Sequence, residues 1–246
     1  MIHRFETLDS TNTKAKAMAL EGAPHGTVVI AERQTNGRGR LGRSFDSPAG
    51  GGIYMSMILR SNCPPTELMH LTCAVAVAVC NGVEKALGFR PGIKWINDLT
   101  VGGKKLGGIL TELSINPNTG LVDFAIVGIG LNCNRNLEDF PEELRAIACS
   151  ASIIAGQAID TDTLITQIIC ALNSMDLSKK AEIIQQYRQD CVNIRKAVTV
   201  IRGDKQRQGT ALDVDENGAL IVQFLDGHTE IIDCGEVSVR GLYAYA

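Results

Sequence analysis

Hydrophobic and polar positions alternate along several short segments of the first two thirds of the chain, and a period of two is typical of β-strands. Gly102 and Gly103 supply a turn between two of these segments. The pattern predicts strands over residues 2–8, 27–32, 52–59, 105–115 and 121–128, with shorter strand ends at 93–95 and 98–101.

Other segments favour helices. Residues 9–12 are capping residue types, and they predict a helix from Thr13 to Glu21 that Gly22 ends. Residues 65–87 are ambiguous because positions 74–79 alternate like a strand, but their length without a turn signal favours a helix. Further helices are expected over residues 141–145 and 151–155, and one long amphipathic helix over 161–189.

The character of the chain changes near residue 197, where short strands follow one another closely. Asn217-Gly218 and Asp226-Gly227 are strong hairpin turn signals. The strands are expected at 198–202, 206–214, 219–224, 229–233 and 237–240, forming a small β-barrel that packs on the main domain. We therefore expect an α+β fold with two domains, residues 1–194 and 195–246.

Composition narrows the function. The 246 residues are 45% hydrophobic and 21% charged, with a formal net charge of −3, so no general basic field attracts nucleic acid or anionic lipid. The N-terminus lacks the apolar stretch of a signal peptide, and the apolar run 71–80 is too short to cross a bilayer. These features predict a cytoplasmic protein that binds neither DNA nor membrane.

The eight cysteines are scattered through the chain without any Cys-x-x-Cys pair. This spacing does not predict a zinc site, and reduced cysteines buried as small hydrophobic residues are expected. They are Cys63, Cys73, Cys80, Cys133, Cys149, Cys170, Cys191 and Cys234.

A loop between Gln34 and Phe45 alternates glycine with arginine and contains no acidic residue. Glycine lets the backbone approach a ligand closely, and arginine offers a fork of donors to carboxylate or phosphate. The loop is therefore expected to wrap an anionic ligand and to lack order when empty. A solvated surface loop, or an arginine–glycine segment gripping nucleic acid, remains the alternative from this stretch alone.

Three further segments carry candidate chemistry. Residues 94–98 place Lys94, Asn97 and Asp98 at a strand end, where functional polar groups gather, and Lys105 precedes a glycine pair that leaves room for a flat ligand. Residues 128–132 contain glycines that mark either a β-bulge or a backbone opened to a ligand. Residues 10–12 cap the first helix and leave backbone N–H groups free for a polar ligand head.

Taken in order, these motifs resemble those of the biotin protein ligases over essentially the whole chain. They read Ser-Thr-Asn, Gln-x-x-Gly-Arg-Gly-Arg-x-Gly-Arg, Ser-Pro-x-Gly-Gly, Lys-Trp-x-Asn-Asp, Gly-x-Lys-Leu-Gly-Gly-Ile-Leu-x-Glu and Gly-x-Gly-x-Asn. The resemblance is to the form without an N-terminal DNA-binding domain. It implies a mixed central sheet with flanking helices, similar to class II aminoacyl-tRNA synthetase cores, and a C-terminal SH3-like barrel.

The resemblance also implies residue roles. Lys105 and Arg40 are the expected catalytic residues. Biotin would be bound by Ser10, Thr11, Asn12, Gln34, Gly37, Arg38, Gly39, Arg40, Lys105, Gly108, Gly128 and Gly130. ATP would be bound by Arg40, Arg43, Phe45, Lys94, Asn97, Asp98, Lys105 and Asn132.

Two positions depart from the family pattern. Phe45 stands where tryptophan is usual and offers a smaller face for stacking a base. Ile96 stands where proline is usual, which is expected to loosen the local turn.

By the same resemblance, biotin and ATP are substrates, Mg²⁺ travels on the phosphates, and the biotin carboxyl carrier protein of acetyl-CoA carboxylase is the partner of a homodimeric enzyme. A lipoate or octanoate ligase of the same superfamily is the alternative enzyme. A non-enzymatic biotin sensor is the alternative from another class.

Overall fold

Seven strands form the central sheet of the protein, whose computed structural model describes residues 1–233 and 237–241. Only β1 and β2 pair in parallel, and every other pair in this sheet is antiparallel, so the sheet is mixed as predicted. The strands follow the order β1 (Ile2–Leu8), β2 (Val28–Gln34), β3 (Gly52–Arg60), β7 (Val122–Asn132), β6 (Lys104–Ile115), β5 (Asp98–Val101) and β4 (Gly92–Lys94).

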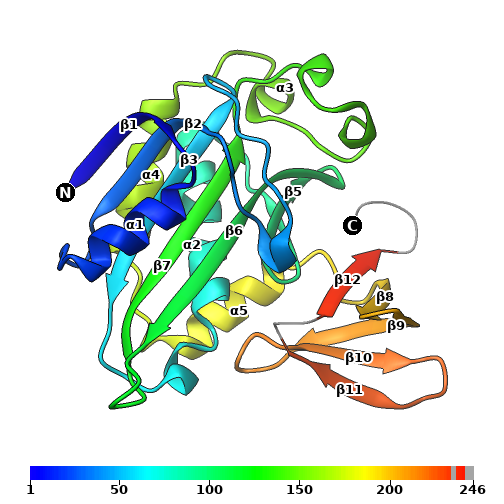
Figure 1. Cartoon of the computed structure of the whole chain (residues 1–246). Coiled ribbons are helices and arrows are strands. Elements are labelled where there is room, and N and C mark those ends of the chain that lie inside the picture. The colour runs from blue at the N-terminus through cyan, green and yellow to red at the C-terminus, as the bar shows by residue number, and fades with distance from the viewer. Residues whose placement is uncertain (234–236, 242–246) are drawn as a thin grey trace.

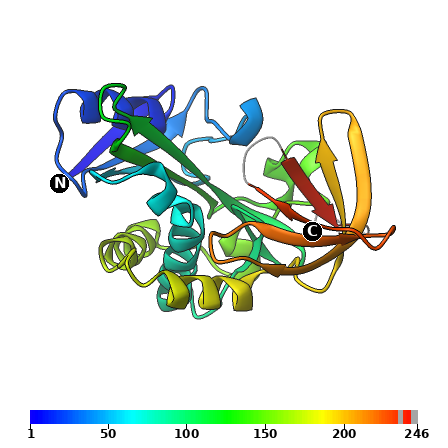
Figure 2. The same cartoon turned by 90° about the horizontal axis from the view of Figure 1, so that it is seen from below.

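Helices cover both faces of this sheet (Figures 1 and 2). The helix α1 (Thr11–Leu20) lies on one face, where Val29 joins a small buried cluster with Ala15 and Ala19. On the other face, α2 (Leu71–Leu87), α4 (Thr161–Asn173) and α5 (Lys180–Asp190) enclose the main core, which contains Val28 and Ile30. Successive residues of β2 thus point to opposite faces, and both faces are buried.

Five short helical elements complete the part of the chain that contains the central sheet. They are η1 (Arg40–Gly42), η2 (Pro65–Leu68), η3 (Leu137–Asp139), η4 (Glu142–Leu144) and α3 (Ala151–Ala155).

Two helix predictions were wrong. The first helix begins at Thr11, two residues earlier than expected, and the side chain of its N-cap residue Ser10 makes no capping hydrogen bond. Residues 161–189 form two helices, α4 and α5, because a local turn interrupts them: Asp176 Oδ1 accepts from the backbone N–H of Ser178 at 3.0 Å and from its hydroxyl at 2.6 Å. Such side-chain bonds compete with helical hydrogen bonds.

The apolar run 71–80 lies within a longer helical segment. Among the described residues, Pro65–Leu87 has the length and the apolar composition of a helix that could cross a membrane. The shorter run 71–80 did not indicate this. Most of this segment, 72% of its most apolar window, is buried inside the protein. Its apolar side chains therefore pack in the core between the sheet, α4 and α5.

A second sheet of five antiparallel strands follows the central sheet along the chain. Its order is β11 (Thr229–Ile232), β10 (Leu220–Phe224), β9 (Lys205–Val214), β8 (Ala197–Arg202) and β12 (Val237–Gly241), close to the predicted strands.

The second sheet packs on the first half, as expected. The Trp95 indole donates to the carbonyl of Gly218 at 2.9 Å, Arg188 Nε donates to that of Val214 at 2.8 Å, and Lys180 Nζ donates to Asn217 Oδ1 at 2.7 Å.

The cysteine prediction was partly wrong. Seven described cysteines are free of disulfides, but Cys63 is half-buried and Cys170 is exposed, while Cys234 lies outside the described residues. Burial lowers the reactivity of the buried cysteines. It raises the pKa of the Cys80 thiol to about 12, so this thiol stays protonated near neutral pH.

Candidate functional site

A cavity of about 680 Å³ opens on the α1 face of the central sheet, between the first turn of α1, the glycine–arginine loop and the β4–β5 turn. The structure brings together nearly all of the predicted site residues around it. The lining includes Ser10, Thr11, Asn12, Gln34, Arg38, Gly39, Arg40, Arg43, Phe45, Lys94, Asn97, Asp98, Lys105, Gly108, Gly128, Gly130 and Asn132. Of the predicted set, only Gly37 does not line the cavity.

Gln34 fixes the start of α1. Its side-chain oxygen accepts from the backbone N–H of Thr11 at 2.8 Å and from the Thr11 hydroxyl at 3.2 Å, and its amide donates to Ser47 at 2.9 Å. The prediction that the first N–H groups of the helix are free for a ligand was therefore wrong for Thr11. Gln34 satisfies that N–H and holds the helix start against the end of β2.

Asn12 is held from two sides. Its side-chain oxygen accepts from the hydroxyl of Ser56 at 2.6 Å, and its Nδ2 donates to the carboxylate of Glu112 at 2.7 Å. Ser56 is fully buried, and Asn12 is only 4% exposed. The polar end of the cavity is thus ordered by the protein itself, which lowers the entropy that ligand binding costs.

The glycine–arginine loop folds back as a tight hairpin. Gly39 donates its N–H to the Arg43 carbonyl at 2.7 Å, Phe45 donates to the Gly37 carbonyl at 2.8 Å, and Arg38 bridges to Ser44. A side chain at Gly37 would place its Cβ 2.3 Å from the Phe45 carbonyl oxygen. The lack of a side chain at Gly37 therefore lets the hairpin close, while its contact with a ligand stays a prediction.

Arg40 lines the cavity and has one buried donor without a partner. Its Nη1 donates to Asn97 Oδ1 at 3.2 Å, whereas its Nη2 is buried and has no hydrogen-bond partner in the described part of the chain. A buried guanidinium nitrogen without an acceptor is costly. Because the guanidinium is always charged, an anionic oxygen is the natural ligand for this nitrogen.

Positive charge dominates the cavity although the whole chain is acidic. Within the described residues, its lining contains six cationic side chains and two carboxylates. The cations are Arg38, Arg40, Arg43, Lys94, Lys105 and Arg135, and the carboxylates are Asp46 and Asp98. The local excess of positive charge suits a polyanionic ligand such as a nucleoside triphosphate.

Lys105 lies near the centre of this group of charges. Its Nζ forms an ion pair with Asp98 Oδ1 at 2.6 Å, and both side chains are mostly buried. A Cβ added to Gly108 would meet the Lys105 ammonium at 3.6 Å. The missing side chain at Gly108 therefore leaves the ammonium open to the cavity.

Glycines form a flat floor on the sheet. Gly108 of β6 pairs with Gly130 of β7, and Leu110 pairs with Gly128 in the same register. The strand β7 runs unbroken through both of its glycines, so the bulge interpretation was wrong, and the register shift between these strands lies at Ser114 instead.

Each floor glycine of β7 faces a specific neighbour. A Cβ at Gly128 would lie 2.1 Å from Asn12 Oδ1, and a Cβ at Gly130 would lie 2.7 Å from the Phe45 ring. Phe45 itself packs edge-on against Tyr54, with ring centroids 6.3 Å apart. These glycines therefore allow Asn12 and Phe45 to approach the sheet.

Gly128→Ala is expected to displace the Asn12 amide and so to weaken the binding of a ligand whose polar head meets Asn12. The loss of one or two oriented hydrogen bonds predicts about a tenfold rise in the dissociation constant. Isothermal titration with biotin, the ligand that the sequence resemblance implies, measures this change. Gly108→Ala is the graded comparison, because its Cβ would meet Asp98 at the milder distance of 3.3 Å. Equal affinities of Gly128→Ala and wild type would contradict the role of this glycine.

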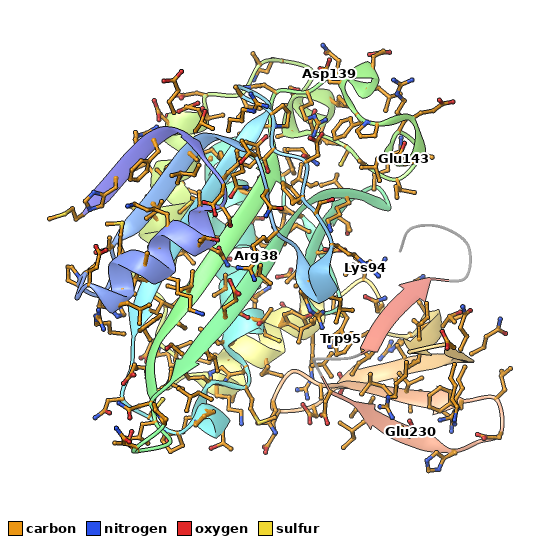
Figure 3. The ribbon with its side chains drawn as sticks, viewed as in Figure 1. Arg38, Lys94, Trp95, Asp139, Glu143 and Glu230 are labelled. Atoms are coloured by element: carbon orange, nitrogen blue, oxygen red, sulfur yellow. The ribbon has the colours of Figure 1, made fainter. Side chains whose placement is uncertain are left out.

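The turn between β4 and β5 is held by elements distant in sequence. The backbone N–H of Trp95 donates to Asn193 at 2.6 Å, and the Tyr187 hydroxyl donates to the Ile96 carbonyl at 3.0 Å. Complete burial raises the pKa of Tyr187, so its hydroxyl remains a donor. These bonds hold the turn that contains Ile96, and the looser turn expected from Ile96 stays a prediction. In Figure 3, Trp95 lies between the central sheet and the C-terminal strands.

Several contributing residues were missed from the sequence. Glu112 and Ser56 orient Asn12, and Arg135 lines the cavity while pairing with Asp46 at 2.7 Å and lying over the Phe140 ring at 4.1 Å. The alternation from Gly108 through Leu110 signals that Glu112 faces the same side. Arg135 lies in an irregular segment where no periodic pattern points to it.

Comparisons with known proteins agree with the site. A family model described as "Biotin/lipoate A/B protein ligase family" matches residues 4–132, and one described as "Biotin protein ligase C terminal domain" matches residues 196–240.

Two curated relatives extend the likeness. The "Bifunctional ligase/repressor BirA" of Bacillus subtilis is 44% identical over 67% of this chain, and the match spans half of that relative's length. The "Biotin--[acetyl-CoA-carboxylase] ligase" of Mycobacterium tuberculosis is 30% identical over 93% of this chain and 85% of its own.

A solved structure shares the architecture. The biotin protein ligase from Aquifex aeolicus in complex with biotin and ATP aligns over 98% of both chains, with a TM-score of 0.82 and 28% identity.

Proposed function

The chain belongs to the biotin protein ligase family and is a ligase, and from this premise we propose that it activates biotin with ATP in the cavity and then transfers the biotinyl group to a carrier lysine. The observation that carries the proposal is the buried, unpartnered Nη2 of Arg40 beside the Asn97 contact, in a cavity rich in positive charge. An anionic phosphate satisfies this donor.

The first step is a displacement at phosphorus. A carboxylate oxygen of biotin attacks the α-phosphorus of ATP, a new P–O bond forms, the bond to the bridging oxygen breaks, and pyrophosphate leaves with the electron pair. No enzyme nucleophile is needed, since the carboxylate is already nucleophilic. Lys105 and Arg40 stabilise the negative charge of the transition state by position and charge alone.

The second step is acyl transfer. The neutral amine of the carrier lysine attacks the acyl carbon of biotinyl-adenylate, the carbon–oxygen bond to phosphate breaks, AMP leaves, and the amine loses its proton to solvent. The glycine–arginine loop keeps the adenylate in place until this attack.

We assign the polar end of the cavity to the ring of biotin and the cationic end to the nucleotide. The ring would meet Ser10, Thr11, Asn12 and Gln34, with the floor glycines Gly108, Gly128 and Gly130 below it and Arg38, Gly39 and Arg40 above. The nucleotide would meet Arg43, Phe45, Lys94, Asn97, Asp98 and Asn132. Phe45 already packs on Gly130 and Tyr54, so its ring has a fixed orientation for stacking on the base.

Magnesium enters as part of the ATP substrate. The described residues contain no group of three or more His, Cys, Asp or Glu side chains arranged to hold a metal ion, and Asp98 is paired with Lys105. We propose that the ion is bound mainly by the phosphates of ATP, which is the usual mode for Mg²⁺ at nucleotide sites.

The remaining proposals follow the family. The carrier is the biotin carboxyl carrier protein of acetyl-CoA carboxylase, and the enzyme acts in the cytoplasm as a homodimer. The name of the Mycobacterium tuberculosis relative supports the choice of carrier. Residues 1–194 form the catalytic domain and residues 195–246 an SH3-like barrel, which the five antiparallel strands and their match to the biotin ligase C-terminal model support.

Incubation with ATP, Mg²⁺, biotin and an apo carrier domain tests the function directly. Mass spectrometry is expected to find biotin on one carrier lysine, and parallel reactions with lipoate and octanoate are expected to leave the carrier unmodified. Modification by lipoate or octanoate but not by biotin would show that the chain is a lipoate or octanoate ligase of the same superfamily. Biotin binding without any modification would point to a sensor.

A further inference from the structure

Glu112 lies on β6 beside the proposed biotin site but was not predicted to take part in it. It follows Gly108 and Leu110 at alternate positions, so all three face the side of the sheet that α1 covers. Its side chain is 29% exposed and does not line the cavity itself, but it contacts Asn12 and Arg38, which do.

One carboxylate joins two separate parts of the site. Oε2 of Glu112 accepts from Asn12 Nδ2 at 2.7 Å, in the first turn of α1. Oε1 accepts from Arg38 Nη2 at 2.9 Å, in the glycine–arginine loop, and Arg38 Nη1 lies 3.4 Å from Oε2. Figure 3 shows Arg38 in front of the central strands, in the loop that crosses them.

The contact with Glu112 also decides how Asn12 is turned. A carboxylate only accepts hydrogen bonds, so the Nδ2 of Asn12 must face Glu112 and the Oδ1 must face the hydroxyl of Ser56, which lies 2.6 Å away. The donors and acceptors that Asn12 offers to a ligand are therefore set mainly by Glu112, with a longer bond from the same Nδ2 to the Leu110 carbonyl at 3.4 Å. A change at Glu112 reaches the ligand through Asn12.

We propose that Glu112 is a positioning residue that couples the ordering of the biotin site at Asn12 to the closing of the loop through Arg38. The inference rests on the proposed function, because it takes Asn12 to contact biotin and the loop to cover the adenylate. The coupling works through geometry: the same carboxylate orients the amide that meets biotin and anchors the loop that retains the product of the first step.

Substitutions can separate the two contacts of Glu112, one arm to Asn12 and one arm to Arg38. Glu112→Gln keeps the length of the side chain and an oxygen for Asn12 Nδ2, but it removes the charge and turns an N–H toward Arg38. Arg38→Gln breaks the same ion pair from the loop side. Glu112→Leu removes both arms. The matched control is Glu32→Gln, an exposed glutamate on β2 of the same sheet that does not line the cavity.

The measurement is the rate at which preformed biotinyl-adenylate leaves the enzyme, with biotin affinity measured separately without nucleotide. Glu112→Gln is expected to release adenylate about tenfold faster with biotin affinity within about twofold of wild type, on the scale of one charge-assisted hydrogen bond. Glu112→Leu is expected to weaken biotin binding about tenfold as well, because Asn12 loses its fixed orientation. The Glu32→Gln control should release adenylate at the wild-type rate.

The double variant Glu112→Gln with Arg38→Gln separates a shared contact from two independent ones. Release from the double variant no faster than from the faster single variant supports the coupling. Release accelerated by the product of the two single effects, or a wild-type release rate for Glu112→Gln alone, overturns it. Thermal unfolding confirms that each variant is folded, and Arg38→Gln, on the surface loop, remains informative if a Glu112 variant does not fold. A wild-type enzyme that forms no biotinyl-adenylate would instead refute the proposed function.

Discussion

Lys105→Ala is expected to remove most of the biotin-dependent ATP–pyrophosphate exchange of this ligase. In the proposed mechanism the ammonium at this position supplies positive charge to the transferring phosphoryl group, and deleting a main electrostatic donor of this kind costs roughly 2–4 kcal/mol of transition-state stabilisation. Exchange of labelled pyrophosphate into ATP, dependent on added biotin, measures the first step without the carrier.

Two variants isolate the cause of that loss. Lys104→Ala removes the neighbouring lysine, which does not line the cavity, and should leave exchange near the wild-type rate. Asp98→Asn removes the carboxylate that pairs with Lys105 at 2.6 Å while keeping the ammonium, and should cost less than Lys105→Ala. A Lys105→Ala enzyme with wild-type exchange would contradict the catalytic assignment. An equal loss in Asp98→Asn would show that the pair, rather than the ammonium, matters.

Arg40→Ala is expected to let biotinyl-adenylate escape before it reaches the carrier. The guanidinium joins the loop to Asn97 and keeps its buried Nη2 without a protein partner, so in the proposed mechanism its removal opens the loop and deletes an anion contact. Hydrogen bonds to charged groups contribute roughly 1.5–3 kcal/mol, which predicts release about ten to a hundred times faster. Two measurements report the escape. One is the rate at which biotinyl-adenylate leaves a purified complex, and the other is the biotinylation of exposed lysines on unrelated proteins.

The controls for Arg40 follow its two contacts. Asn97→Ala removes the acceptor of Nη1 and should accelerate release by less than Arg40→Ala, because Nη2 still reaches the anion. Arg33→Ala removes an exposed arginine on β2 outside the cavity and should have no effect. Full retention of the adenylate by Arg40→Ala would contradict the capping role of the loop.

Much of the fold was predictable because local patterns and tertiary structure agree. The alternation in β3 and β6, the glycine pair at 102–103 and the Asn217-Gly218 turn each belong to elements that form where expected. The failure at 161–189 is equally local in origin. Amphipathic spacing continues through that stretch, but Asp176 and Ser178 bond within a turn, and only the packing of both helices against α2 makes the break favourable.

The candidate site was predicted in outline and corrected in detail. Arg40, Lys105 and Asn12 were identified from motif order, and the structure lines one cavity with all three. Gly37 was predicted as a ligand contact and does not line that cavity. A glycine beside a ligand and a glycine beside a backbone carbonyl look alike in a sequence, and only the structure shows that a Cβ at Gly37 would lie 2.3 Å from the Phe45 carbonyl oxygen.

The sequence by itself determined the kind of chemistry, since it contains the glycines, arginines and lysine in a characteristic order, and it determined the strands that carry them. Only the tertiary structure decided which charges remain available. It paired Arg38 with Glu112 across 74 positions and Arg40 Nη1 with Asn97 across 57, while leaving Arg40 Nη2 buried without a partner. Hydrogen bonds and ion pairs act over a few ångströms in space, whereas sequence patterns report only the neighbours along the chain. The loop proposed to cover the adenylate therefore lies in one short segment, but the contacts that hold it come from β6 and the β4–β5 turn.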